Sequence, residues 1–249
     1  MAGQIKILNT FIHNLSMEET LSLVNDTINN KESIHHVVVN AGKIVQMQKD
    51  KQLHESVNNS DIINADGQAV VWAAKFLNKP LKERVAGIDL MENLVELAYK
   101  NNHKIYLFGA KEKVIKKVVS IYTNKYGENL IAGYRNGYYG KDDEATIAKD
   151  IASSGANMLF VAISSPKKEN FLYQFKNDLK SVNFIMGVGG SFDVISGLTK
   201  RAPLWMQNNG LEWFYRFIQE PKRMWKRYLV GNTKFIYLVF KEKIRGSNL

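Results

Sequence analysis

The sequence of 249 residues contains no cysteine, which excludes a disulfide scaffold, a thiol nucleophile and a cysteine-ligated zinc or iron–sulfur centre. It also lacks a signal-peptide core at its start and any apolar run near the ~20 residues that a membrane-spanning helix needs. No D-x-D or H-E-x-x-H motif and no serine nucleophile elbow occurs. These absences favour an enzyme without a metal or other cofactor over a metalloenzyme, while a metal site made only of carboxylates stays open.

Acidic residues are few toward the C-terminal end. The whole chain has 34 Lys and Arg against 24 Asp and Glu, a formal net charge of +10, but residues 200–249 have 11 against 3. The same segment holds three of the four tryptophans. We therefore expect two parts, a core over 1–197 and a basic, aromatic appendage over 198–249. A basic patch of this kind indicates a partner that carries phosphates, such as nucleic acid, anionic lipid or a phosphorylated substrate.

Within the appendage, Pro221 suits the first turn of a helix. In that helix Trp225 and Tyr228 fall on one side and Lys222 and Lys226 on the other, a pattern typical of a helix that lies on a membrane surface. Two other interpretations remain: the aromatic side packs on the core or on a second subunit, or the segment binds single-stranded RNA. No motif of an RNA-binding module supports the last interpretation.

Helical and β-strand patterns alternate along the core. A capping box from Ser16 to Glu19 begins the first helical stripe, and five short apolar runs are continuous, as in strands buried on both faces. These runs are 36–39, 62–65, 105–108, 158–163 and 184–188. We therefore predict an α/β fold: a mostly parallel sheet flanked by helices, Rossmann-like, with a C-terminal basic amphipathic helical appendage.

In a sheet of this kind, ligands bind beyond the carboxyl ends of the strands, so the residues that leave those ends are the candidates for a site. Asp66 directly follows the run 62–65 and precedes Gly67. A carboxylate there could act as a general base, or it could cap the helix expected over 68–77. The two roles are compatible, and both stay open.

Two further strand ends carry features that suit an anion. After the fourth apolar run, Ser165 as N-cap and Pro166 as first helical residue predict a helix start, and Lys167 and Lys168 add positive charge to it. The alternative is a solvated first turn. After the fifth run, the glycines around Gly189 would let the backbone approach a diphosphate, or they form a tight turn that needs a positive φ.

Seven segments carry a resemblance to a known family. In chain order they read VVVNAGKI, INADGQAVV, RVAGIDLMENL, YLFGAKEKV, SSPKKENF, GVGGSFDVISGLTKRAP and GLEWFYRFIQEPKR. By their order and spacing, the chain resembles the WecG/TagA/CpsF glycosyltransferases, family 26 of that classification, over nearly its whole length.

The resemblance implies an inverting, metal-independent glycosyltransferase whose appendage docks on the membrane. Such enzymes move N-acetylmannosamine, its uronic acid or a glucose-type sugar from a UDP-sugar to a lipid-linked glycan acceptor, typically N-acetylglucosamine on undecaprenyl diphosphate. The product enters a surface polysaccharide or a teichoic acid. The resemblance further implies an anionic membrane surface as partner, no nucleic acid, self-association into a homo-oligomer as one option, and a peripheral location on the inner, cytoplasmic face of the bacterial plasma membrane.

By position, the resemblance also implies roles for individual residues. Asp66 would deprotonate the acceptor hydroxyl, and Arg216 and Arg223 would stabilise the departing UDP. The residues expected to contact substrate are Asn40, Arg84, Lys168, Gly189, Asp193 and Lys226.

Three positions depart from the family pattern. Val38 stands where a threonine is common, so any hydroxyl role there is lost. Lys168 replaces the glutamine of the usual P-K-Q-E, which puts contacts to the donor sugar in question. Lys226 stands where the family has an arginine, which keeps the charge but loses the bidentate fork.

Two rival functions stay open beside the glycosyltransferase. A nucleotide-sugar sensor or an RNA-binding protein would use the basic appendage for binding without catalysing transfer. An enzyme that acts on a soluble nucleotide substrate would use the appendage for oligomerisation. The residues name neither the sugar nor the polymer.

Overall fold

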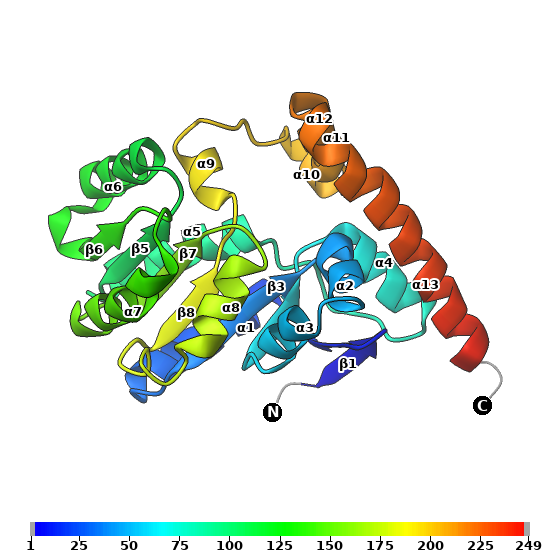
Figure 1. Cartoon of the computed structure of the whole chain (residues 1–249), viewed down its shortest axis with the longest axis horizontal. Helices are drawn as coiled ribbons and strands as arrows, with labels where there is room; N and C mark the ends of the chain where they lie inside the picture. Colours follow the sequence, from blue (N-terminus) through cyan, green and yellow to red (C-terminus); the bar gives the residue numbers. More distant parts are fainter. Residues whose placement is uncertain (1–2, 247–249) are drawn as a thin grey trace.

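A computed structural model describes residues 3–246, except for the side chains of Arg223, Lys226 and Arg227. The core is a six-stranded sheet covered by helices on both faces, and a helical segment leaves it at one end (Figure 1). The strands of this sheet are β3 (Ile34–Val39), β4 (Ile62–Ala65), β5 (Ile105–Gly109), β6 (Ile131–Arg135), β7 (Met158–Ala162) and β8 (Phe184–Gly187). All neighbouring strands run parallel, so the predicted α/β fold is confirmed.

The strand order, β4-β3-β8-β7-β5-β6, places the first two strands of the sheet together at one edge. The chain then crosses to the other side of β3 and returns toward it, which creates a switch in winding direction beside β3. In the register of β3 with β4, Val39 pairs with Ala65. The next residues, Asn40 and Asp66, therefore leave the sheet side by side.

Three observed strands lie outside the predicted set. β6 reads IAGYR and is only half-buried at the sheet edge, so it has no continuous apolar run to reveal it. β1 (Gln4–Ile7) and β2 (Thr10–His13) form a separate antiparallel hairpin. Each strand has only two apolar side chains, of which Ile7 and Ile12 are fully buried.

The two faces of the sheet pack against different sets of helices. Leu107 and Phe160 join a cluster with α1, α5 and α6, whereas their neighbours Phe108 and Val161 join a cluster with α7 and α8. This alternation is the two-residue period of a strand buried on both sides. The helices that cover the sheet are α1 (Met17–Asn29), α2 (Ala41–Met47), α3 (Lys51–Asn58), α4 (Gln68–Phe76), α5 (Gly87–Lys100), α6 (Glu112–Tyr126), α7 (Glu144–Ser153) and α8 (Lys167–Gln174).

Short helices follow the last strand and lead into the long helix α13. The short helices are α9 (Ser191–Ile195), α10 (Leu204–Asn208), α11 (Glu212–Gln219) and α12 (Pro221–Trp225). A π-helical turn, η3 (Lys226–Val230), then leads into α13 (Gly231–Gly246). Two 3-10 turns, η1 (Glu128–Leu130) and η2 (Lys141–Asp143), lie in the core. Within residues 3–246, none of these helices combines the length and apolar character needed to cross a membrane.

Helix α13 runs back along the core instead of projecting from it (Figure 1). Phe235 and Val239 are buried in a cluster that also contains Ile7 of the hairpin and Ile44 of α2. Farther along α13, Glu242 accepts a hydrogen bond from the backbone N–H of Leu8 at 2.6 Å. The appendage therefore shares a hydrophobic core with the sheet domain, and the division into 1–197 and 198–249 stays a prediction.

Candidate functional site

The carboxyl ends of β3, β4, β5, β7 and β8 open into a cleft of about 1720 Å³. It lies at the switch in winding direction, where open α/β sheets bind ligands. Residues of α11 and α13 also line it, so the appendage forms one of its walls. The predicted site residues with described side chains all line this cleft: Asn40, Asp66, Arg84, Lys168, Gly189, Asp193 and Arg216. The side chains of Arg223 and Lys226 lie outside the described part of the chain.

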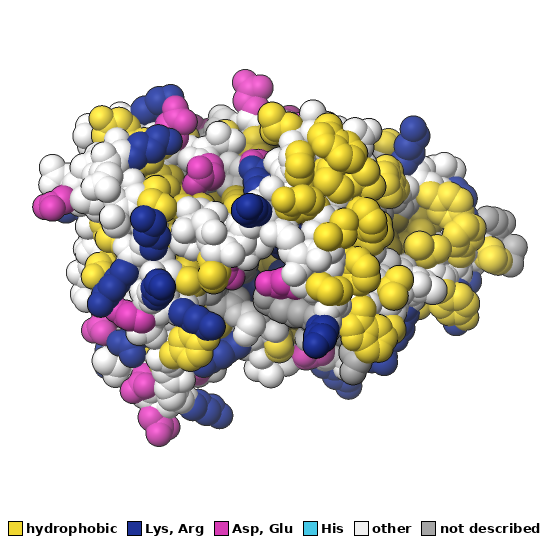
Figure 2. Space-filling model, turned by 90° about the horizontal axis from the view of Figure 1, so that it is seen from above, with side chains coloured by type: hydrophobic (Ala, Val, Ile, Leu, Met, Phe, Trp, Pro, Cys, Tyr) yellow, Lys and Arg dark blue, Asp and Glu magenta, His cyan; other side chains and the backbone are white. Residues whose placement is uncertain are grey.

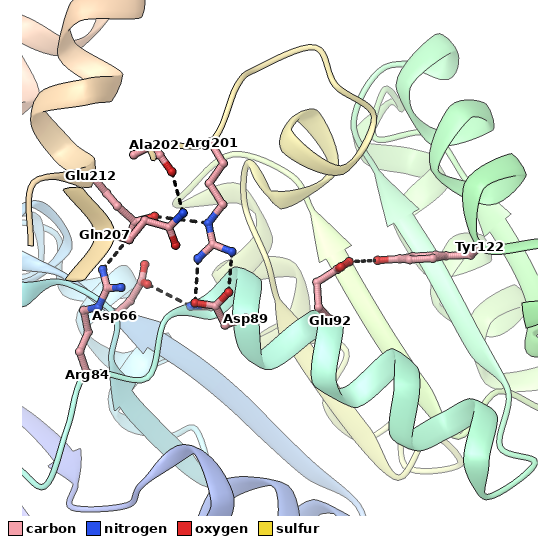
Figure 3. Close-up of polar contacts among 10 residues, drawn as sticks. Asp66, Arg84, Asp89, Glu92, Tyr122, Arg201, Ala202, Gln207 and Glu212 are labelled. Atoms are coloured by element: carbon pink, nitrogen blue, oxygen red, sulfur yellow. Dashed lines mark hydrogen bonds and ion pairs between the residues drawn. The ribbon is translucent and has the colours of Figure 1, made fainter. Parts of the chain in front are cut away.

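The two carboxylate oxygens of Asp66 differ in their hydrogen bonding. Its Oδ1 accepts a hydrogen bond from the backbone N–H of Gly87 at 3.0 Å, at the first turn of α5 (Figure 3). For its other oxygen, Oδ2, the structure gives no hydrogen-bond donor among the side chains and backbone groups that it describes, and the side chain is half-buried in the wall of the cleft. The alternative role as helix cap is wrong, because Gly67 holds the N-cap position of α4 and the Asp66 carboxylate turns to α5 instead.

Asn40 begins α2 as its N-cap, and its Oδ1 accepts a hydrogen bond from the backbone N–H of Lys43 at 3.1 Å. The loop after β4 approaches it closely. A Cβ atom on Gly67 would lie 3.1 Å from the Cβ of Asn40, a separation that few real side chains accept. Glycine after Asp66 therefore lets the carboxylate and the Asn40 amide line the same part of the cleft.

A buried ionic cluster of one carboxylate and two ammonium groups lies in the floor of the cleft. Glu169 Oε1 is 2.8 Å from Lys43 Nζ and 2.7 Å from Lys168 Nζ, and Lys43 also donates to the carbonyl of Val38 at 2.8 Å. All three ionic side chains are at least nine-tenths buried. Burial alone would raise the pKa of Glu169, but the two lysines outweigh it and hold that pKa well below its usual range.

The predicted start of the helix after β7 is wrong in its details. Helix α8 begins at Lys167, with Pro166 in the N-cap position, and no side chain caps it. The backbone turn begins earlier, since the N–H of Lys168 donates to the carbonyl of Ser164 at 3.2 Å. Lys168 is neither solvated nor free to act as a mobile anion ligand, because it crosses the backbone of Gly187 and ends at Glu169.

A chain of ion pairs joins the core to the appendage beside Asp66 (Figure 3). Arg201 donates two parallel hydrogen bonds, of 2.6 and 2.7 Å, to the carboxylate of Asp89. Glu212, in the first turn of α11, lies 3.5 Å from Arg201 Nε and 2.5 Å from Arg84 Nη1. Arg84 is therefore in the cleft, as predicted, but it is bound to a carboxylate of the appendage.

The glycine run after β8 forms a tight turn, with Gly189 at a φ of 55°. Asp193 follows in the first turn of α9 and faces the cleft. Arg216 of α11 borders both the main cleft and a smaller hollow of about 70 Å³, which Asp193 also lines. The core residue and the appendage residue thus meet at one place.

One end of the cleft is basic and aromatic. It is lined by Lys111, Tyr138, Tyr139 and Lys167, and Tyr138 is 69% exposed. Lys167 Nζ lies 3.4 Å from the centre of the Tyr139 ring. Ammonium groups and an open ring suit a phosphate and a flat base. Within residues 3–246, no group of three or more histidine, aspartate or glutamate side chains is arranged to hold a metal ion.

The opposite end of the cleft is apolar and merges with the surface. Trp72 and Phe76 of α4 line it together with Leu229, Ile236 and Phe240 from η3 and α13. The Phe76 and Phe240 rings are 4.9 Å apart, centre to centre. Figure 2 shows that hydrophobic side chains gather over the appendage, with basic side chains at their edge. The cleft therefore extends from polar side chains at the strand ends to an exposed apolar surface on the appendage.

Comparison with known proteins shows the family. Residues 5–249 match the family described as the Glycosyl transferase WecG/TagA/CpsF family. The chain belongs to this family. The resemblance seen in the sequence is thus confirmed over nearly the whole chain.

Three relatives of this WecG/TagA/CpsF member bear one name, N-acetylglucosaminyldiphosphoundecaprenol N-acetyl-beta-D-mannosaminyltransferase. The protein of Bacillus subtilis strain 168 is 41% identical over 196 residues, which cover 78% of this chain and 74% of the relative. That of Bacillus spizizenii is 35% identical over 75% of this chain and 71% of its own. That of Staphylococcus aureus strain MW2 is 30% identical over 97% of this chain and 94% of its own.

Reasoning from the sequence missed the partners of the predicted residues. Lys43 and Glu169 form the cluster with Lys168, and Asp89, Arg201 and Glu212 form the chain with Arg84. Every one of these five lies inside a segment that carried the resemblance, but a motif does not state which charges pair. The pairs become visible only from the distances between these side chains in the folded protein.

Proposed function

We propose that the protein transfers N-acetylmannosamine from UDP-N-acetylmannosamine to N-acetylglucosamine on undecaprenyl diphosphate. Its membership of a glycosyltransferase family and the shared name of three relatives support this reaction. The observation that carries the proposal is Asp66, a carboxylate in the cleft with one oxygen fixed by Gly87 and the other without a donor among the described residues. That arrangement suits a general base.

In the proposed reaction, a hydroxyl of the acceptor sugar attacks the anomeric carbon of the donor. Asp66 takes the hydroxyl proton while the new carbon–oxygen bond forms. The bond between the anomeric carbon and the β-phosphate oxygen of UDP breaks, and its electron pair leaves with UDP. Attack from the face opposite the leaving group inverts the anomeric centre. The hydrogen bond from Gly87 would keep the carboxylate oriented through this step.

The departing UDP gains negative charge, which cationic side chains can stabilise. Arg84 and Arg216 line the cleft from the core and from the appendage. We assign Arg216 to the leaving diphosphate, and we place the nucleotide at the end lined by Lys111, Tyr138 and Lys167. Arg223 and Lys226 keep their proposed roles in leaving-group stabilisation and substrate contact without a structural account.

The appendage is proposed to rest on the inner face of the bacterial plasma membrane. Leu204, Ile218, Leu229 and Ile236 are each more than half exposed, and apolar surface of this extent on one chain indicates contact with a lipid or protein partner. The net positive charge of the same segment favours anionic lipid. Liposome flotation with and without anionic lipid tests this location directly, against an RNA gel shift at the same salt concentration.

The reaction is tested with purified full-length protein, a synthetic N-acetylglucosamine lipid diphosphate and a panel of UDP-sugars. We expect release of UDP and an acceptor heavier by one N-acetylhexosamine only with UDP-N-acetylmannosamine. Transfer of a different sugar alone would replace the donor in the proposal. Tight UDP binding without turnover, with any sugar in the panel, would favour a nucleotide-sugar sensor.

A further inference from the structure

Glu212 contacts two arginines at once through different oxygens. Its Oε2 lies 2.5 Å from Arg84 Nη1 and its Oε1 lies 3.5 Å from Arg201 Nε. Arg201 in turn holds Asp89 through two hydrogen bonds. Between 18% and 37% of each of the four side chains is exposed, so water screens these pairs less than it screens pairs on an open surface.

Both anchor points of Glu212 lie at the start of α5. Arg84 precedes that helix by three residues, and Asp89 is in its first turn. The first N–H of the same helix, at Gly87, holds the Asp66 carboxylate. One helix start therefore fixes both the candidate base and the point where α11 docks (Figure 3).

Arg216 stands four residues after Glu212 on α11, so the two side chains share one face of the helix. Glu212 faces the arginines, and Arg216 lines the cleft one turn further on. A second contact fixes the same end of α11: a Cβ on Gly210 would lie 2.6 Å from the Gln68 side chain at the start of α4. The contacts at the N-terminal end of α11 therefore determine where Arg216 lies in the cleft.

We propose that Glu212 is a positioning residue: by binding Arg84 and Arg201 it seats α11 on the start of α5 and so holds Arg216 in the same cleft as Asp66. The inference rests on the proposed function for its kinetic consequence, but the seating of α11 does not depend on which sugar is transferred. Glu212 itself touches no reacting group in this scheme.

The test compares Glu212→Gln with Glu242→Gln, a matched control. Glu242 is equally exposed, at 23% against 24%, and also pairs the appendage with a core side chain, Lys79, but it lies outside the cleft lining. We expect Glu212→Gln to lower kcat by up to about 100-fold, since a misplacement of a catalytic group by about 1 Å can cost on the order of 100-fold. Glu242→Gln should leave kcat within about twofold, a change below 0.5 kcal/mol.

A kinetic cycle with Arg216→Ala separates positioning from general damage. If Glu212 acts through Arg216, then Glu212→Gln adds less than about twofold to the loss in an Arg216→Ala background. If the double variant instead loses kcat by the product of the two single-variant fold losses, the proposal is overturned. Glu212→Asp, which keeps the charge, should recover part of kcat.

Hydrogen exchange of the α11 amides gives a readout that needs no substrate. Exchange over residues 212–219 should quicken in Glu212→Gln and not in Glu242→Gln, while the core helices stay protected. Unchanged exchange with unchanged kcat would overturn the positioning role. Quicker exchange in a protein that shows no sugar transfer in its wild-type form would overturn the proposed function alone.

Discussion

Replacing Glu169 by glutamine removes the only carboxylate of the buried ionic cluster and leaves two ammonium groups facing a neutral amide. Glu169 is 1% exposed, and Lys43 and Lys168 are 9% and 7% exposed. The change keeps the shape of the side chain, so no cavity forms. Loss of stability would therefore report charge imbalance rather than lost packing.

The magnitude follows from the desolvation of the lysines. Removing one partner of a buried ion pair typically costs about 3–5 kcal/mol, because the remaining charge is left uncompensated. Here two charges share the partner, so we expect the upper part of that range. At about 2–4 °C per kcal/mol for a chain of this length, the melting temperature of Glu169→Gln should fall by about 8–20 °C.

The assay is thermal unfolding followed by circular dichroism, with Lys168→Gln as the control. In the wild-type background, Lys168→Gln leaves a one-to-one pair of Lys43 with Glu169 and should cost little stability. In the Glu169→Gln background, the same change removes one of the two ammonium groups beside the neutral amide and should raise the melting temperature. A melting temperature for Glu169→Gln within about 2 °C of wild type, or further loss in the double variant, would refute this reasoning.

Four other outcomes are expected. Asp66→Asn should cut transfer by about 10²–10⁴-fold while UDP still binds, measured by turnover and calorimetry. Transfer should survive EDTA; loss that Mg²⁺ or Mn²⁺ restores would count against leaving-group stabilisation by arginines. Deleting the residues after Gly197 should abolish transfer in the same assay. Burial lowers the pKa of His35 to about 4 and of His36 to about 3, so the unfolded chain binds more protons below about pH 6.5. Urea unfolding should therefore show stability falling by on the order of 1.4 kcal/mol per pH unit and per histidine from about pH 6.5 toward 4.

The sequence predicts the buried part of the fold well, because short continuous apolar runs between turn residues are typical of strands buried on both faces. The run 62–65 coincides with β4, and the predicted capping box at Ser16 and Glu19 is present in the structure. Edge elements are harder, since β6 and the hairpin bury only part of their side chains. Their stability depends on neighbours that a local pattern does not contain.

The site shows the same limit at the level of single charges. The position of Asp66 follows from the strand before it, so its place in the cleft could be predicted. Its hydrogen bond to Gly87, 21 residues later, could not. The sequence predicts Lys168 at an anion-binding helix start or in a solvated first turn, yet its ammonium group is buried against Glu169, a carboxylate that also pairs with the distant Lys43. Long-range pairing decides whether a charged residue meets solvent or protein.

Helix α13 has a consequence for how the chain is made. Phe235 and Val239 complete a cluster that contains Ile7 of the hairpin, so residues far apart along the chain are in contact there. During translation the hairpin leaves the ribosome before α13 has been made. Throughout that interval the apolar side chains of the hairpin and α2 that pack on α13 are exposed, which favours binding of the nascent chain by chaperones.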